Sequence, residues 1–154
     1  MIATWRIDPV TLREVVDDPA ALEELLDSGA PGDRVWALRV LGRLDDARRE
    51  GEALIASDGG FRALLLFADV LSVKGEFTAA SALQERATAL ADTPARQALA
   101  LQHTGKRLFD EKRYAEAAER FRSALALRER HGAAAEAIAS SRFALARAES
   151  LLAD

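Results

Sequence analysis

Apolar residues recur at spacings of three and four along almost the whole chain, and this periodicity is the feature that most constrains the fold. Alternating β-branched segments bounded by turns are almost absent, so we expect helices rather than strands. The breaks between the periodic segments are short and contain turn residues: Asp58-Gly59-Gly60, Gly75, Thr93-Pro94, Lys112-Arg113 and Gly132. Loops this short make consecutive helices antiparallel neighbours, which predicts an all-α fold.

Proline and glycine positions predict where the first helices begin and end. Asp8-Pro9 and Asp18-Pro19 each have the form of an N-cap followed by proline at the first helical position. They would open two short helices, one carrying Leu12, Val15 and Val16, the other carrying Leu22, Leu25 and Leu26. Gly29 can end the second of these helices, and a third begins near Asp33. The later helices are expected at 46–57, 61–74, 77–91, 94–111, 114–131 and 133–152.

The helical segments repeat along the chain. The string Tyr114-x-x-Ala117-x-x-x-Phe121-x-x-Ala124 has counterparts in Phe77-x-x-Ala80-x-x-x-Gln84-x-x-Ala87 and Leu44-x-x-Ala47-x-x-x-Gly51-x-x-Leu54. The alanines at 47, 80 and 117 are separated by 33 and then by 37 residues. At the same offset upstream, Leu101-x-x-Thr104-Gly105-x-x-Leu108 corresponds to Leu64-x-x-Phe67-Ala68-x-x-Leu71.

This pattern resembles the tetratricopeptide repeat, whose period is about 34 residues and whose signature includes a large residue, a small one, then a spaced alanine and an aromatic. The resemblance is good over 98–131, fair over 61–92 and weak over 31–57, where Pro31 and Arg34 occupy expected apolar positions. Gly51 and Gln84 also replace the aromatic of the second helix. The first unit could equally begin a HEAT-type repeat.

The resemblance implies a right-handed α-solenoid that forms a single domain. Its expected parts are an N-terminal helical extension at 1–30, a divergent repeat at 31–60, a repeat at 61–93, the best-matching repeat at 94–131 and a capping helix at 132–154. Each hairpin leaves one apolar face uncovered until its neighbour stacks on it, so the array is stable only as a stack.

Gly105 is the least expected residue of the best-matching repeat, because glycine inside a helix costs about 1 kcal/mol relative to alanine. Small residues let two helices of a hairpin approach closely, while larger residues fill the space around the contact. Gly105 and Ala117 would form this contact in one repeat, and Ala68 and Ala80 in the repeat before it. The surrounding bulk would come from Leu101, Leu108, Tyr114 and Phe121.

The resemblance further implies that the first helices of successive hairpins line a concave groove, and that this groove binds another protein or peptide. The residues expected on this face are Arg62, Leu65, Asp69, Ser72, Gln102, His103, Lys106 and Phe109. Family members that hold the C-terminal carboxylate of chaperone tails use Lys, Asn and Arg side chains on these helices. Here Leu65 and Asp69 stand where a cation and an amide would be needed. We therefore expect a mixed polar and apolar ligand rather than an acidic chain end.

Catalytic and metal-binding motifs are weak. The chain has no cysteine and two histidines, so a metal site would need carboxylates arranged by the fold. His131 precedes Gly132 at an expected helix C-terminus, where a positive charge is favourable. Thr104-Gly105-Lys106 lacks the first glycine and the final Ser or Thr of a phosphate-binding loop. The carboxylate pairs Asp110/Glu111 and Glu116/Glu119 have no evident nucleophile beside them. We expect a non-catalytic protein without cofactor or metal.

The composition limits the possible partners. The net charge is −4, and the arginines at 120, 122, 128 and 130 are interrupted by Glu129, so we expect no nucleic acid partner. The longest apolar run, from Ala63 to Leu71, contains an aspartate and is too short to span a bilayer. The N-terminus lacks a basic segment followed by a long apolar one, so we expect a cytoplasmic protein that does not bind membranes. Self-association into a homodimer through exposed faces of the array is the alternative to partner binding.

Overall fold

The structure is a computed structural model that describes residues 5–153. These residues form a short antiparallel hairpin followed by helices that fill most of the chain. The elements are β1 (Trp5–Ile7), β2 (Glu14–Val16), α1 (Pro19–Ser28), α2 (Pro31–Val40), α3 (Leu44–Ser57), α4 (Phe61–Val73), α5 (Phe77–Ala89), α6 (Pro94–Asp110), α7 (Tyr114–Arg130) and α8 (Ala135–Ser150). The expectation of an all-α architecture is therefore confirmed for residues 19–150.

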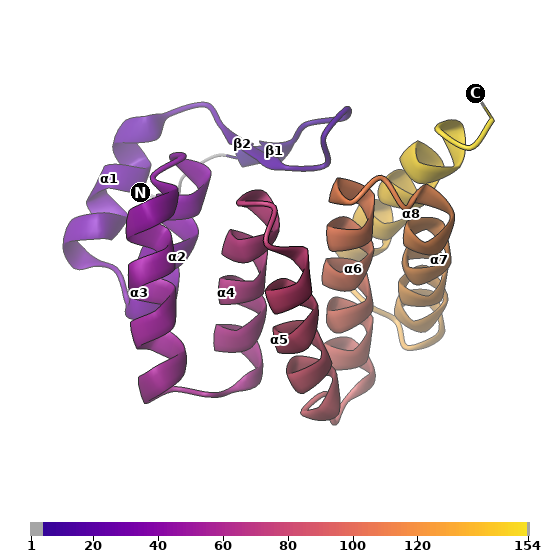
Figure 1. Cartoon of the computed structure of the whole chain (residues 1–154). Helices are drawn as coiled ribbons and strands as arrows, with labels where there is room; N and C mark the ends of the chain where they lie inside the picture. The colour runs from indigo at the N-terminus through magenta and orange to yellow at the C-terminus, as the bar shows by residue number, and fades with distance from the viewer. Residues whose placement is uncertain (1–4, 154) are drawn as a thin grey trace.

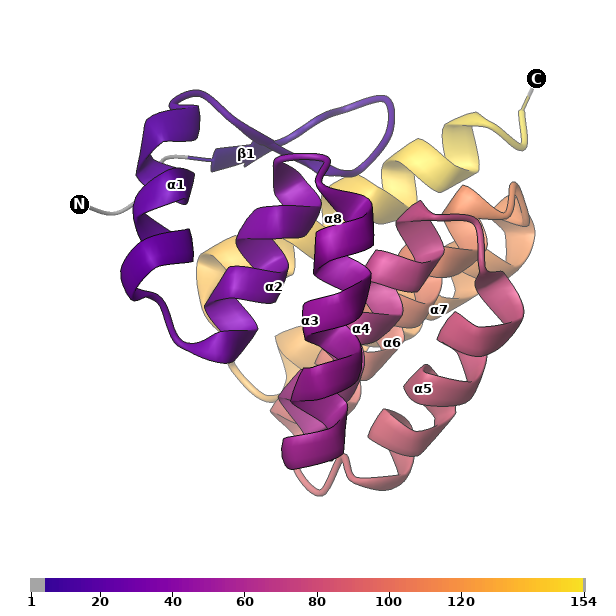
Figure 2. The same ribbon diagram turned by 60° about the vertical axis from the view of Figure 1, so that its left-hand side comes forward.

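The helices pack in chain order, as the short loops require. Each helix from α1 to α8 packs on the next, and α2 also contacts α4, which in turn contacts α6. The first helices of successive hairpins thus form one row, with α3, α5 and α7 packed on it (Figures 1 and 2). This arrangement is compatible with a helical repeat. None of the described helices is long and apolar enough to cross a membrane.

The repeat spacing reappears in the backbone of the turns. Gly42, Gly75 and Lys112 each follow the first helix of a hairpin and adopt positive φ angles of 80°, 80° and 64°. These positions are 33 and 37 residues apart, like the repeated alanines. In each turn the next residue donates its N–H to a carbonyl of the preceding helix: Arg43 to Leu38, Glu76 to Leu71 and Arg113 to Leu108. This is a Schellman-type helix end, for which glycine is the favoured residue.

The small residues of the repeat lie where the hairpins are tightest. Ala68, Ala80 and Ala117 are fully buried, as is the Phe121 side chain. A Cβ atom at Gly105 would lie 2.6 Å from Cε1 of Phe121, so the glycine accommodates the phenylalanine ring. The side chain that approaches Gly105 most closely is thus Phe121, and the expected contact of Gly105 with Ala117 stays a prediction. Tyr114 packs edge-on against Phe109 at 5.2 Å between ring centroids.

The expectation for residues 8–16 was wrong. The segment around Asp8-Pro9 forms a turn between two paired strands instead of a helix, with Trp5 opposite Val16 and Ile7 opposite Glu14. The Asp8 carboxylate accepts hydrogen bonds from the N–H groups of Val10 and Thr11, 2.8 and 2.9 Å away. An aspartate before a proline can cap a helix or close a turn. The β-branched Val15 and Val16 that follow favour the strand.

The second proline signal was correct. The Asp18 carboxylate accepts a hydrogen bond from the Ala20 N–H, Pro19 is the first residue of α1, and Gly29 follows its last residue. The N-terminal extension therefore consists of a hairpin and one helix. Further along, α2 begins at Pro31 instead of near Asp33, and α3 begins at Leu44, two residues before its expected start.

Buried apolar residues form two clusters along the array. One involves α2 to α5 together with Ala100, and the other joins α6, α7 and α8 to Leu12 of the hairpin loop. Polar side chains, Gln84 and Arg107, are buried at the α5–α6 junction between the two clusters. Buried polar side chains therefore separate the two apolar clusters at the α5–α6 junction.

Candidate functional site

The structure divides the eight residues predicted to line the groove into three sets. Arg62, Asp69, His103 and Lys106 are exposed or half-buried. Leu65 is 3% exposed but still contributes to the wall of a cleft. Ser72, Gln102 and Phe109 are buried, so the prediction that they contact a ligand from an open groove was wrong.

Neighbouring elements cover the three buried residues. The Gln102 amide oxygen accepts a hydrogen bond from the Ser141 hydroxyl of α8 at 2.7 Å. Phe109 belongs to the apolar cluster that contains Leu12 of the hairpin loop. Ser72 borders the narrow space beneath the same loop. Helical spacing placed these residues on the correct helices, but it could not show that other parts of the chain pack over them.

The N-terminal hairpin, residues 5–16, covers the ends of α4 and α6 (Figure 1). Leu12, at the tip, is 2% exposed and has a positive φ of 59°. Arg13 lies 3.4 Å from Asp110 of α6, and the Val10 carbonyl accepts a hydrogen bond from Arg147 of α8. About 30 Å³ of space remains beneath the loop. The chain itself therefore fills this end of the groove.

A buried ion pair fixes the second strand of the hairpin. The Arg39 guanidinium donates to both carboxylate oxygens of Glu14, at 2.9 and 3.2 Å. Burial opposes ionisation of Glu14, but the attraction of Arg39 and its hydrogen bonds, assisted by Lys106, lower the pKa of Glu14 to about 2. Burial raises the pKa of Asp110, against the attraction of Arg13. These charges hold the hairpin in place, and Glu14 stays ionised at neutral pH.

The other end of the groove is open. A cleft with a volume of about 530 Å³ lies between the beginnings of α4 and α6, and we call it the α4–α6 cleft. Its lining is Asp58, Gly60, Phe61, Arg62, Leu65, Leu66, Arg96, Leu99 and His103. Of the predicted groove residues, the structure brings Arg62, Leu65 and His103 together here.

Charged groups surround the apolar floor of the α4–α6 cleft. The Arg96 guanidinium carbon lies 5.5 Å from the centroid of the Phe61 ring, and Arg62 donates to Asp33 of α2 at 3.0 Å. His103 Nδ1 lies 3.0 Å from Asp69 Oδ1, which orients the imidazole. Leu99 is 36% exposed, although it lies beside other apolar side chains. This cleft can accept an apolar side chain flanked by polar groups.

The sequence contained a signal for the missed cleft residues. Leu66 follows Arg62 by four positions and Leu99 precedes His103 by four, so each shares a helix face with a predicted groove residue. Stepping one helical turn forward from Arg62 and one turn back from His103 would have included both leucines. Helical spacing could not predict the contact between Phe61 and Arg96, because it joins two helices that are far apart in the sequence.

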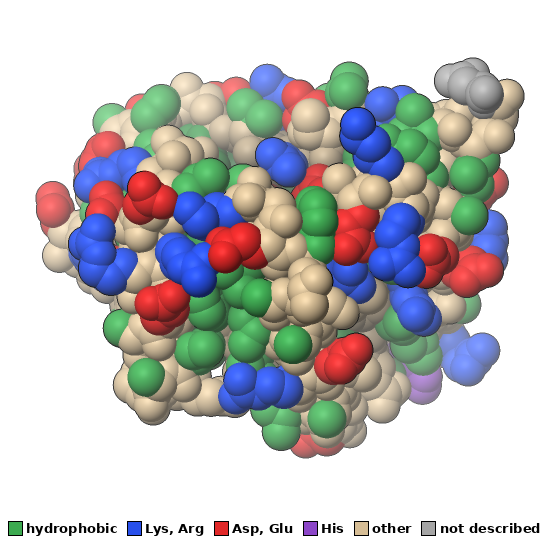
Figure 3. Space-filling model, viewed as in Figure 1, with side chains coloured by type: hydrophobic (Ala, Val, Ile, Leu, Met, Phe, Trp, Pro, Cys, Tyr) green, Lys and Arg blue, Asp and Glu red, His purple; other side chains and the backbone are tan. Residues whose placement is uncertain are grey.

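Three of the four carboxylates considered as catalytic pairs, Asp110, Glu111 and Glu116, are engaged in ion pairs. Glu111 contacts both Arg107 and Arg113, Glu116 pairs with Arg113, and Asp110 pairs with Arg13. His131 directly follows α7, as expected from its place before Gly132. Within residues 5–153, no group of three or more His, Cys, Asp or Glu side chains is placed to hold a metal ion. On the face shown in Figure 3, basic and acidic side chains are interspersed.

Comparison with known proteins adds no further constraint: no protein-family model, curated protein or solved structure matches this chain significantly.

Proposed function

We propose that this chain is a tetratricopeptide-like module, a right-handed helical solenoid that binds a peptide or helix of a partner protein in the α4–α6 cleft. The observation that carries the proposal is the cleft itself, where Leu65, Leu66 and Leu99 meet beside two arginines and His103. Apolar anchors with a polar surround are the usual anatomy of a peptide-binding surface.

The common turn geometry supports the assignment of the repeats. Gly42 ends the first helix of the 31–60 unit in the same way as Gly75 ends that of the next unit. This similarity favours a first tetratricopeptide-like unit over a HEAT-type one. Ala47, the counterpart of Ala80 and Ala117, is also fully buried.

The ligand we expect is a short segment with an apolar side chain and polar neighbours, bound at roughly micromolar strength because the contact area is small. The groove offers little for an acidic chain end. Arg62 already pairs with Asp33 and Arg96 with Asp92, and Asp69 lies beside His103. Lys106 lies at the end covered by the hairpin, where it stabilises the Glu14 carboxylate.

An affinity pull-down from native cell extract, analysed by mass spectrometry, tests the proposal when paired variants are used. Leu99→Glu places a charge on the floor of the cleft, whereas Leu90→Glu makes the same change at an exposed leucine outside it. We expect the wild type and Leu90→Glu to retain the partner and Leu99→Glu to lose it. A partner retained equally by all three proteins would place the binding site elsewhere on the molecule.

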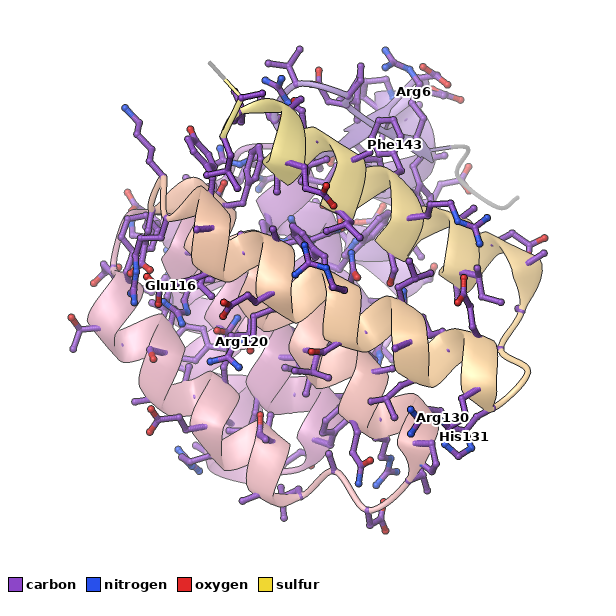
Figure 4. All side chains as sticks on the ribbon, turned by 90° about the vertical axis from the view of Figure 1, so that its right-hand side faces the viewer. Arg6, Glu116, Arg120, Arg130, His131 and Phe143 are labelled. Atoms are coloured by element: carbon purple, nitrogen blue, oxygen red, sulfur yellow. The ribbon has the colours of Figure 1, made fainter. Side chains whose placement is uncertain are left out.

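Self-association through the end of the array is the second candidate. It is favoured by Phe143 of α8 (Figure 4), which is 44% exposed, and by Leu152, which is 53% exposed. Light scattering coupled to size-exclusion chromatography distinguishes the two functions. A dimer that becomes monomeric on Phe143→Ser would support self-association, and a wild-type monomer at high concentration would reject it.

A further inference from the structure

A second cleft lies on the opposite side of α6, between α5 and α7. Its lining is Ser81, Gln84, Glu85, Thr88, Gln97, Ala100, Leu101, Thr104, Arg107, Arg120 and Leu127, and it has a volume of about 550 Å³. We call it the α5–α7 cleft. Its floor is α6, and its walls are α5 and α7. Both of these helices pack on α6 (Figure 1). The binding surface proposed above does not include it.

The cleft lies at a position where one hairpin carries an aromatic residue and the next carries threonine. At the preceding junction, the Phe67 ring of α4 packs over Gly51 of α3, where a Cβ atom would lie 2.5 Å from the ring. The corresponding residue of α6 is Thr104, 37 positions later, and it leaves that space unfilled. Leu101 shows the consequence: it is partly exposed, whereas its counterpart Leu64 is 1% exposed.

Polar groups replace the aromatic at this junction. Gln84 occupies the position held by Gly51 in the first repeat, and its amide donates to the His103 carbonyl at 3.2 Å. Its oxygen accepts a hydrogen bond of 2.7 Å from Nε of Arg107. These hydrogen bonds fix Arg107, whose side chain is 8% exposed, at one side of a cleft whose apolar lining residues are Ala100, Leu101 and Leu127.

The guanidinium of Arg107 retains binding capacity. Its Nε donates to Gln84 and its Nη1 to Glu111, while Nη2 has no hydrogen-bond partner among residues 5–153. Arg120 extends from α7 toward α5, and it has no ion-pair partner in the same part of the chain (Figure 4). Glu85 is the acidic residue of the lining and belongs to the α5 wall. Glu111 offsets part of the charge of Arg107 but lies outside the lining, so an anion in the cleft would face Arg107 and Arg120 on its α6 and α7 sides.

We propose that the α5–α7 cleft binds a small amphipathic carboxylate. The carboxylate would accept hydrogen bonds from Arg107 and Arg120, and its apolar body would lie on Ala100, Leu101 and Leu127. The size fits this class of ligand, since small-molecule sites typically have volumes of roughly 300–1,000 Å³ and mostly apolar walls with a few placed polar groups.

The test is a titration with decanoate, followed by amide chemical shifts in NMR spectra of the whole chain. We expect saturable shifts centred on Leu101 and Thr104, and none with decyltrimethylammonium, which has the same chain and the opposite charge. Shifts of equal size with both compounds, or shifts confined to other regions of the molecule, would overturn the proposal.

Two variants locate the site. Thr104→Phe introduces the aromatic found at Phe67, and it should abolish decanoate binding without lowering the melting temperature. Its control is Ala115→Phe, which adds a phenylalanine on the exposed surface and should bind decanoate like the wild type. Arg120→Gln should weaken binding about tenfold. Its control is Arg130→Gln, at an exposed arginine outside the cleft, which should leave affinity unchanged. Undiminished binding in both Thr104→Phe and Arg120→Gln would contradict the assignment.

Discussion

Replacing Gly105 with alanine should improve helix propensity but worsen packing, and the structure predicts a net loss of stability. Alanine should stabilise an exposed helix interior by about 1 kcal/mol relative to glycine. At this position, however, the new Cβ atom would lie 2.6 and 2.7 Å from two carbons of the Phe121 ring. That ring is fully buried, so it cannot turn out into solvent without losing its packing. Overpacking of this kind costs about 1–3 kcal/mol, so the net loss of stability should be about 1 kcal/mol.

Urea unfolding followed by circular dichroism measures this difference, and a matched glycine provides the control. Gly59 lies in the α3–α4 loop, and a Cβ atom there would have its nearest neighbour 3.9 Å away. Gly59→Ala should therefore leave stability unchanged or raise it by less than about 1 kcal/mol. Shortening the ring with Phe121→Leu in the Gly105→Ala background should remove the clash, which would appear as a coupling energy of about 1 kcal/mol in the double-mutant cycle. A Gly105→Ala protein about 1 kcal/mol more stable than the wild type would refute the reasoning.

Three further changes test the turns, the hairpin and the repeat contacts. Lys112→Gly should raise the free energy of unfolding by up to about 1 kcal/mol, because Lys112 holds a positive φ that glycine adopts without strain; an unchanged urea midpoint would contradict this. Glu14→Gln should cost about 3 kcal/mol at neutral pH, since it leaves Arg39 buried without its partner. The folded pKa of Glu14, about 2, lies below its ordinary value of 4.5, so its contribution is complete above pH 4.5 and is lost as pH falls toward 2. The difference between wild type and Glu14→Gln in urea unfolding should shrink over that range, and a constant difference would exclude the ion pair as its cause. Ala117→Leu should cost about 1–3 kcal/mol and Ala115→Leu less than about 0.5 kcal/mol, and equal melting temperatures for the two would reject the repeat register.

Features that depend on neighbours along the chain were predictable. The spacing of apolar residues located the helices, and the glycines at 42 and 75 end them by adopting a backbone conformation that most residues avoid. Asp18 caps α1 through a hydrogen bond to a residue two positions away. Such interactions are encoded within a few residues, so a single sequence contains all the information needed to recognise them.

The candidate site depended on contacts that the sequence does not specify locally. Asp8-Pro9 is compatible with a helix start and with a turn, and the choice is supported by Glu14, whose carboxylate binds Arg39, 25 residues away. The resulting hairpin covers Phe109 and Ser72, which helical spacing alone places on an open groove.

The sequence by itself therefore determined the helices, the repeat spacing and the small residues at the hairpin contacts. The tertiary structure decided which faces remain open: it closed one end of the groove with the N-terminal hairpin, left the α4–α6 cleft exposed and opened the α5–α7 cleft at Thr104. The physical reason is the range of the interactions. Helix propensity and capping act over three or four residues, whereas burial of a side chain depends on every element that packs over it.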